Sequence, residues 1–459
     1  MDMNLNWGLA SALLATLLLS ACTIAPPKSS IGDVEQTLLA QYPSLAIPEN
    51  ILGQSTAPGE LDKTLTLTQT IHTLLAHSPQ VRLQFAQLNI ADAEALQSEL
   101  IDNPGISIGA LKPDEGGRWQ LDTSFSQPLL SLFTRSLRRQ LAQEQILQAQ
   151  LELQVALQKL IAEASERYFA AVAALQHCVV QNQMLEATEA RQQLALSLYR
   201  AGNMSENTFL SYDNELRHAQ QQLEKRQATA YEKRLQLLAF IGLPSSHTID
   251  LPTQLPVLPT ERLEHSALLE QAKTNRAEIK IAQQQLDLID KRLQLVSKEN
   301  GWRDIQLGVN AEREFDGAIN YGPEVEFSLP VFNRGQGKIA AIKAQKSYWQ
   351  ARLQQLELDA DSAIAQAINT MDSALIQLKN LKAALEVAEK RVVLSNREVN
   401  FMLASPFELL SIKRQQIQLA HEFTKEQKNY WRGRAQLELA IGKSLDINEH
   451  AHHQEHHHD

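Results

Sequence analysis

The residues with the clearest chemical potential lie in the last ten positions of the chain, which are rich in histidine. Six of the 13 histidines are found there: His450, His452, His453, His456, His457 and His458. Imidazole nitrogens with interspersed carboxylates are typical ligands of Zn, Ni, Co or Cu ions. The tail is therefore a candidate metal site. A purification tag and a solvated tail that binds nothing are the alternatives, and the interrupted spacing argues against a tag.

The rest of the sequence carries no pattern of a catalytic site. It contains no nucleophile elbow, no glycine-rich phosphate loop and no pair of CxxC motifs, and the other histidines lack the H-E-x-x-H spacing of a zinc protease. We therefore expect no enzyme activity and no cofactor. A metal-dependent hydrolase that uses the tail ranks last among the functions considered.

Composition limits the remaining classes of protein. The 459 residues carry a formal net charge of -10 without a basic patch, which argues against a nucleic-acid partner. Two cysteines cannot form a disulfide framework, and Cys178, in an apolar helical stretch, is expected to be a small core residue. No apolar run reaches about 18 residues, which excludes a conventional helical membrane protein.

The N-terminal segment has the pattern of a targeting signal. An apolar stretch from Gly8 to Ala21 is too short to span a bilayer, and it ends in Leu19-Ser20-Ala21-Cys22. This end resembles a bacterial lipobox, which predicts that residues 1–21 are removed and that Cys22 carries an N-terminal lipid. The proline-rich residues 22–60 are then expected to form an extended, lipidated tail. A plain signal peptide with an incidental cysteine and a buried N-terminal helix are the alternatives.

Long stretches of the chain lack both glycine and proline, the residues that most often end a helix. They cover 129–201, 203–241 and 338–405. A helix of about 70 residues would be about 100 Å long. Within these stretches apolar residues recur at alternating steps of three and four, as in Leu153, Leu157 and Leu160. The spacing predicts long helices that pack along seams in a helical array.

Ahead of each long stretch the apolar period changes to two, which is the period of a β-strand. Leu121, Thr123 and Phe125 alternate with polar residues, as do the residues of 305–312, of 321–329 and, more weakly, of 106–110. We therefore predict four strands that have one apolar and one polar face. Such strands fit either a soluble sheet on a helix or a lipid-facing barrel. Four strands cannot close a barrel, but three copies would supply about twelve.

The two halves of the sequence match at an offset of about 200 residues, which indicates an internal duplication. Each half is expected to contain a helix, a strand pair, a very long helix, a reversal and a second helix. At the first reversal Gly202 is expected to cap one helix, and Asn203 with Glu206 to open the next as a capping box. At the second reversal we expect Ser405 at the N-cap and Pro406 at the first helical position.

Together these features resemble the TolC family of outer-membrane efflux channels. The motifs behind the resemblance are Asn103-Pro104, Gln127-Pro128-Leu129, Leu329-Pro330-Val331 and Tyr199-Arg200-Ala201-Gly202 followed by Ser205. The resemblance implies a mostly α fold with a small β part. Duplicated helical hairpins would form a trimeric periplasmic α-barrel, and four strands per protomer a twelve-stranded transmembrane β-barrel. It implies a homotrimer that docks a periplasmic adaptor and an inner-membrane pump. Thr23, where inner-membrane lipoproteins often have Asp, favours the outer membrane by analogy.

The resemblance also divides the chain into domains. A signal peptide at 1–21 and a lipidated tail at 22–60 precede a first repeat at 61–242, with strands at about 104–128 and a hairpin at 129–242. A linker at 243–259 leads to the second repeat at 260–442, with strands at about 303–330 and a hairpin at 335–442. The histidine-rich tail occupies 443–459.

Site residues follow from the same resemblance. The hairpin tips would form a closable aperture and the adaptor-docking surface, with Tyr199, Arg200, Gly202, Ser205, Ser405 and Pro406 as contacts. Carboxylates on the polar strand faces would line a lumen that favours cations, namely Asp122, Glu312, Glu324 and Glu326. Solvated charge without selectivity is the alternative. Together with the resemblance, the histidine tail favours the heavy-metal branch of such efflux systems.

A periplasmic adaptor lipoprotein is the runner-up function, because adaptors also combine a lipid anchor with helical hairpins. Adaptors usually have one long hairpin within a lipoyl and soluble β-barrel frame. Two hairpins in tandem, each after a pair of alternating strands, disfavour this alternative.

Overall fold

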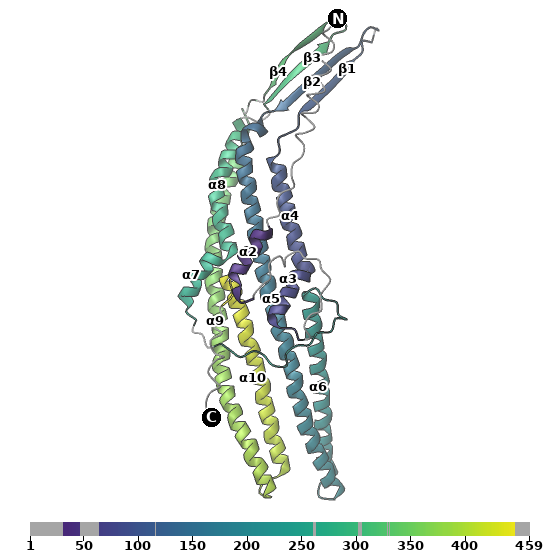
Figure 1. Cartoon of the computed structure of the whole chain (residues 1–459), viewed down its shortest axis with the longest axis vertical. Coiled ribbons are helices and arrows are strands. Elements are labelled where there is room, and N and C mark those ends of the chain that lie inside the picture. The colour runs from purple at the N-terminus through teal and green to yellow at the C-terminus, as the bar shows by residue number, and fades with distance from the viewer. Residues whose placement is uncertain are drawn as a thin grey trace. The chain divides into compact units, whose positions relative to one another are not determined.

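The computed structural model describes residues 31–45, 64–114, 116–259, 263–301, 305–327, 329 and 331–445 (Figure 1). The predicted signal peptide, Cys22 and the histidine tail lie outside these residues. Among the helices that the structure describes, none combines the length and the apolar character needed to cross a membrane.

The chain divides into two compact units, which we describe separately. The strand unit contains Asn89–Ile146 and Asp304–Phe327. The helical unit contains the described residues of Ile31–Leu88, of Leu147–Arg303 and of 329–445.

Helices form most of the described chain, in an order that repeats. The elements before the first strand pair are α2 (Ile31–Gln41), the 3-10 helix η1 (Pro43–Leu45), α3 (Leu67–His77) and α4 (Pro79–Glu99), and the second half has α7 (His265–Asn275) and α8 (Ala277–Gly301). After the strand pairs come α5 (Leu130–Arg200) with α6 (Glu206–Phe240), and α9 (Gln336–Asn400) with α10 (Pro406–Ile441). Since α5 has 71 residues and α9 has 65, the prediction of very long helices is confirmed.

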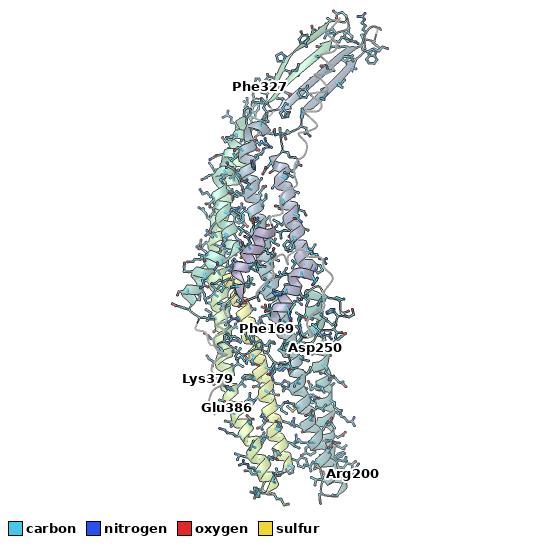
Figure 2. All side chains as sticks on the ribbon, viewed as in Figure 1. Phe169, Arg200, Asp250, Phe327, Lys379 and Glu386 are labelled. Carbon is cyan, nitrogen blue, oxygen red and sulfur yellow. The ribbon has the colours of Figure 1, made fainter. Side chains whose placement is uncertain are left out.

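Packing against neighbours, more than intrinsic propensity, stabilises helices of this length. Leu157 of α5 and Leu237 of α6 are fully buried in the core of the helical unit. Phe169 of α5 stacks on Trp431 of α10 with ring centroids 4.9 Å apart, and Figure 2 labels Phe169. Along α9, which packs against α10 (Figure 1), a seam of small and medium side chains is buried, comprising Ala360, Ile364, Ala367, Met371 and Ala374.

Two glycines make the internal duplication visible in the backbone. Gly242 follows α6 with φ 85°, and Gly442 follows α10 with φ 75°. A Cβ atom on Gly242 would lie 2.5 Å from the carbonyl oxygen of His77, where α3 meets α4. A Cβ atom on Gly442 would lie 3.1 Å from the carbonyl oxygen of Asn275, where α7 meets α8. Each helical hairpin therefore ends against the helix junction of its own half.

The N-terminal segment of the helical unit is fixed by glutamine side chains of α5. The Nε2 atoms of Gln154 and Gln158 donate to Oε1 of Gln41 at 2.8 and 2.9 Å. The backbone N–H of Ser444 donates to the carbonyl oxygen of Gln41 at 2.9 Å. Segments from the two ends of the described chain thus meet on α5.

The strand unit holds one antiparallel sheet in the order β1 (Gly105–Leu111), β2 (Gln120–Pro128), β3 (Gln306–Arg313) and β4 (Ile319–Glu326). Strands β2 and β3 pair across the two halves of the chain. The fourth strand was predicted to reach residue 329, but β4 ends at Glu326. Its partner β3 begins at Gln306, directly opposite Glu326, so no β3 residue remains to pair further.

Candidate functional site: the sheet faces and the hairpin tips

The strand register gives the sheet one acidic face. Asp122 lies directly opposite Glu312, and residues that are directly opposite point to the same side of a sheet. Glu324 lies opposite Gly308 and Glu326 opposite Gln306, which places both carboxylates on the same face as Asp122 and Glu312. The four carboxylates that the sequence singled out therefore share one face. That this face lines a lumen stays a prediction.

The other face of the sheet is apolar and open. Its large apolar side chains come from all four strands and include Ile106, Ile108, Leu121, Phe125, Leu307, Val309, Tyr321 and Val325. Arg313, at the end of β3, is the charged residue on this face. Ile108 is 75% exposed and Tyr321 is 84% exposed in the single chain. Apolar patches of this kind on a protein mark an interaction with another protein or with a membrane.

Both edges of the sheet also lack a partner strand within the described chain. Strands β1 and β4 are the outer strands, and neither pairs with a further strand of the described chain. An outer strand presents a row of unpaired N–H and C=O groups that can accept another strand. The sheet is therefore incomplete on one face and at two edges.

The first hairpin tip, between α5 and α6, is a glycine-capped turn, as predicted. Gly202 has φ 78°, and the N–H of Asn203 donates to the carbonyl oxygen of Leu198 at 2.9 Å. The predicted capping box of Asn203 with Glu206 is wrong. Ser205 is the N-cap, and its hydroxyl accepts from the N–H of Thr208, because Ser205 is the extended residue directly before the helix.

The second tip, between α9 and α10, repeats the same backbone with different side chains. The N–H of Leu403 donates to the carbonyl oxygen of Glu398 at 2.8 Å, and Met402, at φ 60°, takes the place that Gly202 has in the first tip. Ser405 is the N-cap and Pro406 the first helical residue, as predicted. Met402 is 94% exposed. No sequence pattern predicted that a non-glycine residue takes this conformation.

All six residues predicted to contact an adaptor are exposed at the tips, namely Tyr199, Arg200, Gly202, Ser205, Ser405 and Pro406. Tyr199 stacks on Phe209 with ring centroids 5.2 Å apart, so part of its surface is used within the hairpin. Figure 2 labels Arg200 near the end of its hairpin. Contact with an adaptor stays a prediction.

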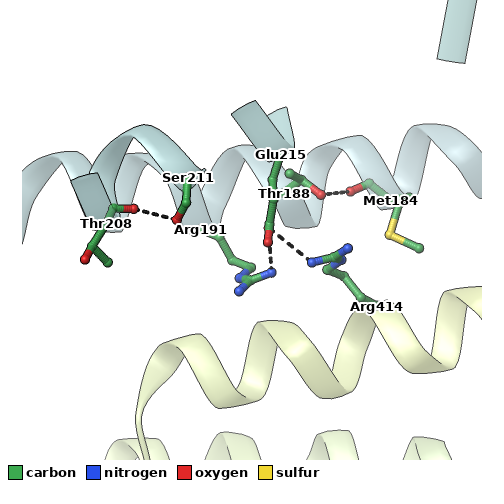
Figure 3. A network of polar contacts seen from close by, with 7 residues as sticks. All are labelled: Met184, Thr188, Arg191, Thr208, Ser211, Glu215 and Arg414. Atoms are coloured by element: carbon green, nitrogen blue, oxygen red, sulfur yellow. Dashed lines mark hydrogen bonds and ion pairs between the residues drawn. The ribbon is translucent and has the colours of Figure 1, made fainter. Parts of the chain in front are cut away.

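A carboxylate joins the two hairpins close to their tips (Figure 3). An oxygen of Glu215 on α6 accepts from Arg191 of α5 at 2.9 Å and from Arg414 of α10 at 3.1 Å. The Arg191 guanidinium lies 5.2 Å from the ring centroid of Tyr212, which itself stacks on Phe407 of α10. We call Arg191, Glu215 and Arg414 the inter-hairpin clasp. Sequence reasoning missed it, because its partners lie on separate helices.

Comparison with known proteins defines the fold. No protein-family model matches the sequence, and no curated protein matches it either. Among solved structures, the chain is similar to the CmeC outer membrane channel of Campylobacter jejuni, with a TM-score of 0.67, 14% identity, and coverage of 87% of this chain and 93% of that chain. It is also similar to the outer membrane protein VceC of Vibrio cholerae, with a TM-score of 0.66, 16% identity, and coverage of 83% and 97%.

A third similar structure is CusC, studied for its folding and transmembrane channel formation, with a TM-score of 0.65, 13% identity, and coverage of 87% and 98%. Across these likenesses the chain has the fold of the TolC-type outer-membrane channels, so the predicted fold class is confirmed.

The clasp should couple the two hairpins measurably. We expect Glu215→Gln and Arg414→Gln, combined in a double-mutant cycle, to give a coupling energy of about 0.5–1 kcal/mol in the free energy of unfolding, since both side chains are partly exposed. The distribution of distances between spin labels on α6 and α10 should also become broader in either variant.

The matched control is Asp213 with Arg217, an ion pair at 2.9 Å within α6 alone. Breaking this pair should leave the distance between the hairpins unchanged. A coupling energy of zero for Glu215 and Arg414 would show that the clasp does not join the hairpins.

Proposed function

We propose that the chain is the outer-membrane channel of a tripartite efflux system and acts as a homotrimer. Three copies would supply twelve strands, which is within the usual range for barrels of the outer membrane. The helical hairpins would continue the passage across the periplasm. The protein would be a passive duct without enzyme activity, and the energy for export would come from an inner-membrane pump.

The incomplete sheet is the observation that carries this proposal. In lipid every backbone N–H and C=O must be hydrogen-bonded, so an open four-stranded sheet cannot span a membrane alone. Pairing β4 of one copy with β1 of the next would remove both open edges in a closed ring. The exposed apolar face suits contact with lipid, and the acidic face suits a wet interior.

The hairpin tips support a docking role at the periplasmic end. Their six exposed predicted contacts could meet a periplasmic adaptor, and the clasp would hold the two hairpins of each copy together at rest. The alternative of a periplasmic adaptor lipoprotein is less well supported, because the chain has two hairpins, each after a pair of strands.

The cargo that we propose is a divalent heavy-metal cation. The support is the acidic sheet face, with Asp122, Glu312, Glu324 and Glu326 repeated in three copies, together with the histidines of the C-terminal tail. The face contains no Lys or Arg within the four strands, so its field favours cations over anions.

A charge on the apolar face should prevent assembly. We expect Val309→Arg to cost about 2–4 kcal/mol per chain by placing a guanidinium in lipid, and to reduce the amount of trimer in the outer membrane. Native gels of detergent-extracted outer membranes would measure this. Asn310→Arg is the matched control, because Asn310 is the next residue on the opposite face and should leave the trimer intact. Equal tolerance of both variants would contradict the proposed barrel.

The lipid anchor is tested by metabolic labelling. We expect radiolabelled palmitate to be incorporated into the wild type and to be lost in Cys22→Ala. Cys178→Ala is the matched control and should keep the label, since Cys178 lies within α5. Unchanged labelling of the Cys22→Ala variant would place the lipid elsewhere, and absence of label from the wild type would exclude it.

The metal proposal is tested in a deletion strain exposed to zinc, nickel, cobalt and copper. Restoring the full chain should raise tolerance to at least one ion several-fold, and restoring a chain without residues 450–459 should raise it less. A chain with the six tail histidines replaced by glutamine separates imidazole binding from tail length. Unchanged tolerance to all four ions would end the metal proposal and leave the channel proposal standing.

A further inference from the structure

A basic cavity lies between the two hairpins of the helical unit. It has a volume of about 540 Å³ and is lined by side chains of α5, α6 and α10. Four of its lining residues are cationic: Arg226 and Lys233 from α6, and Lys425 and Lys428 from α10. Glu422 is the carboxylate among the residues that line it.

Two histidines form one wall of the cavity. Nδ1 of His177 on α5 lies 3.0 Å from Nδ1 of His421 on α10, and the rings stack with centroids 5.2 Å apart. A hydrogen bond between two Nδ1 atoms needs one donor and one acceptor, so at least one ring is neutral. Within the described residues, the buried Nε2 of His421 has no hydrogen-bond partner.

The positive charge of the cavity is not balanced by its own side chains. In the described chain no carboxylate oxygen lies within ion-pair distance of Arg226 or Lys428, whereas Lys425 contacts Glu426 at 3.9 Å. Lys233 can interact with carboxylates outside this cavity. It also lines a neighbouring cavity with Glu163 and Glu166. Arg226 and Lys428 are therefore the cations on which a ligand site would depend.

The titration of the cavity residues agrees with this excess of positive charge. Burial lowers the pKa of His177 to about 4, with further contributions from His421, Arg226 and Lys428. Burial and Arg226 lower the pKa of His421. Burial, Arg432 and Lys425 lower the pKa of Lys428, against an opposing effect of Glu426. Neighbouring cations disfavour the protonated, charged form of each of these groups. A bound anion would offset this repulsion.

Other ionisable groups face the pair from the same helices. A neighbouring cavity that shares Arg226 and His421 is also lined by His218 and Glu215 of α6 and by Arg414 of α10. Glu215 is already bound by two arginines in the clasp, so it does not neutralise Arg226. Cys178, next to His177, has its pKa raised by burial and stays a neutral thiol.

We propose that this cavity binds a small multivalent oxyanion, of the phosphate or carboxylate class, and that protonation of the His177–His421 pair strengthens the binding. Arg226 and Lys428 would supply positive charge, and the histidine pair would supply an additional donor once it takes up a proton. The bound anion would contact α5, α6 and α10, and so would join the two hairpins. The site does not depend on the exported solute or on trimer formation.

The direction of the pH dependence follows from linkage. Without an anion the histidine pair is neutral at neutral pH, because its pKa values lie below the ordinary one. A bound anion raises those pKa values, so binding takes up protons. Affinity is then highest in acid and falls as the pH rises through the pKa values of the occupied site.

Sulfate is a suitable probe, because its charge does not change across the pH range of interest. Calorimetric titration of the full chain in non-ionic detergent, with chloride at equal ionic strength as the reference, should show sulfate binding. The binding should be about tenfold tighter near pH 5.5 than near pH 7.5. Pyrophosphate and citrate at fixed pH would then distinguish phosphate from carboxylate ligands.

Two kinds of variant separate the contributions. Arg226→Gln with Lys428→Gln should weaken sulfate binding about tenfold or more at both pH values, and Lys428→Gln alone serves if the double variant does not fold. His177→Asn with His421→Gln should keep the affinity near pH 7.5 and lose its increase in acid. Lys379→Gln with Lys382→Gln on α9 is the charge-matched control, and should bind sulfate as the wild type does; Figure 2 labels Lys379.

The proposal is overturned if the wild type binds no sulfate at either pH, or if the Arg226 and Lys428 variants bind it unchanged. It is also overturned in favour of a cation site if Zn²⁺ alone binds, and binds only when both histidines are present.

Discussion

The whole architecture depends on one constraint, which is the alternation of apolar and polar side chains along four strands that cannot close on themselves. The register places Phe125 and Val309 on one face and Asp122 and Glu312 on the other. A soluble protein would cover the apolar face, and a membrane protein would turn it to lipid. In lipid the open edges of β1 and β4 would each leave backbone groups unsatisfied, at several kcal/mol per group. Under the proposed outer-membrane role, the sheet would therefore need strands from further copies of the chain to complete it.

The helical unit is built from two repeated hairpins. Gly242 and Gly442 each allow the end of one hairpin to approach a helix junction of its own half, where any side chain would overlap the backbone or take a strained conformation. Small residues such as Ala360 and Ala367 let α9 lie close to its neighbours over its length. The two hairpins are joined by apolar contacts, such as the stacking of Phe169 on Trp431, and also by polar contacts. The clasp and the His177–His421 pair are two such polar contacts. We expect the clasp to weaken with ionic strength and the histidine pair to depend on pH.

The sequence was sufficient to predict the features that depend on a local residue pattern. The absence of glycine and proline predicted α5 and α9, and the period of two predicted which residues share each face of the sheet. Where two local solutions compete, the sequence was ambiguous: Asn203 and Ser205 are both good N-cap residues, and only the backbone shows that Ser205 has that role. The inter-hairpin contacts could not be predicted at all. Glu215 and Arg414 are 199 residues apart, and His177 and His421 are 244 apart. Their meeting depends on the rotation and register of packed helices, which a periodic pattern leaves undetermined.

The two tips show how duplication can keep a backbone and change its surface. Both reversals close with the same hydrogen bond from the residue after the left-handed position, to Leu198 in one and to Glu398 in the other. Glycine takes the left-handed position without strain in the first tip, whereas Met402 takes it in the second at a cost of about 1–2 kcal/mol. That cost is not offset by burial, because Phe401, Met402 and Leu403 are all exposed. The first tip instead presents Gly202 and Asn203. A partner that contacts both tips therefore meets one polar and one apolar surface on the same backbone, so the repeat that makes the hairpins equivalent in shape does not make them equivalent in recognition.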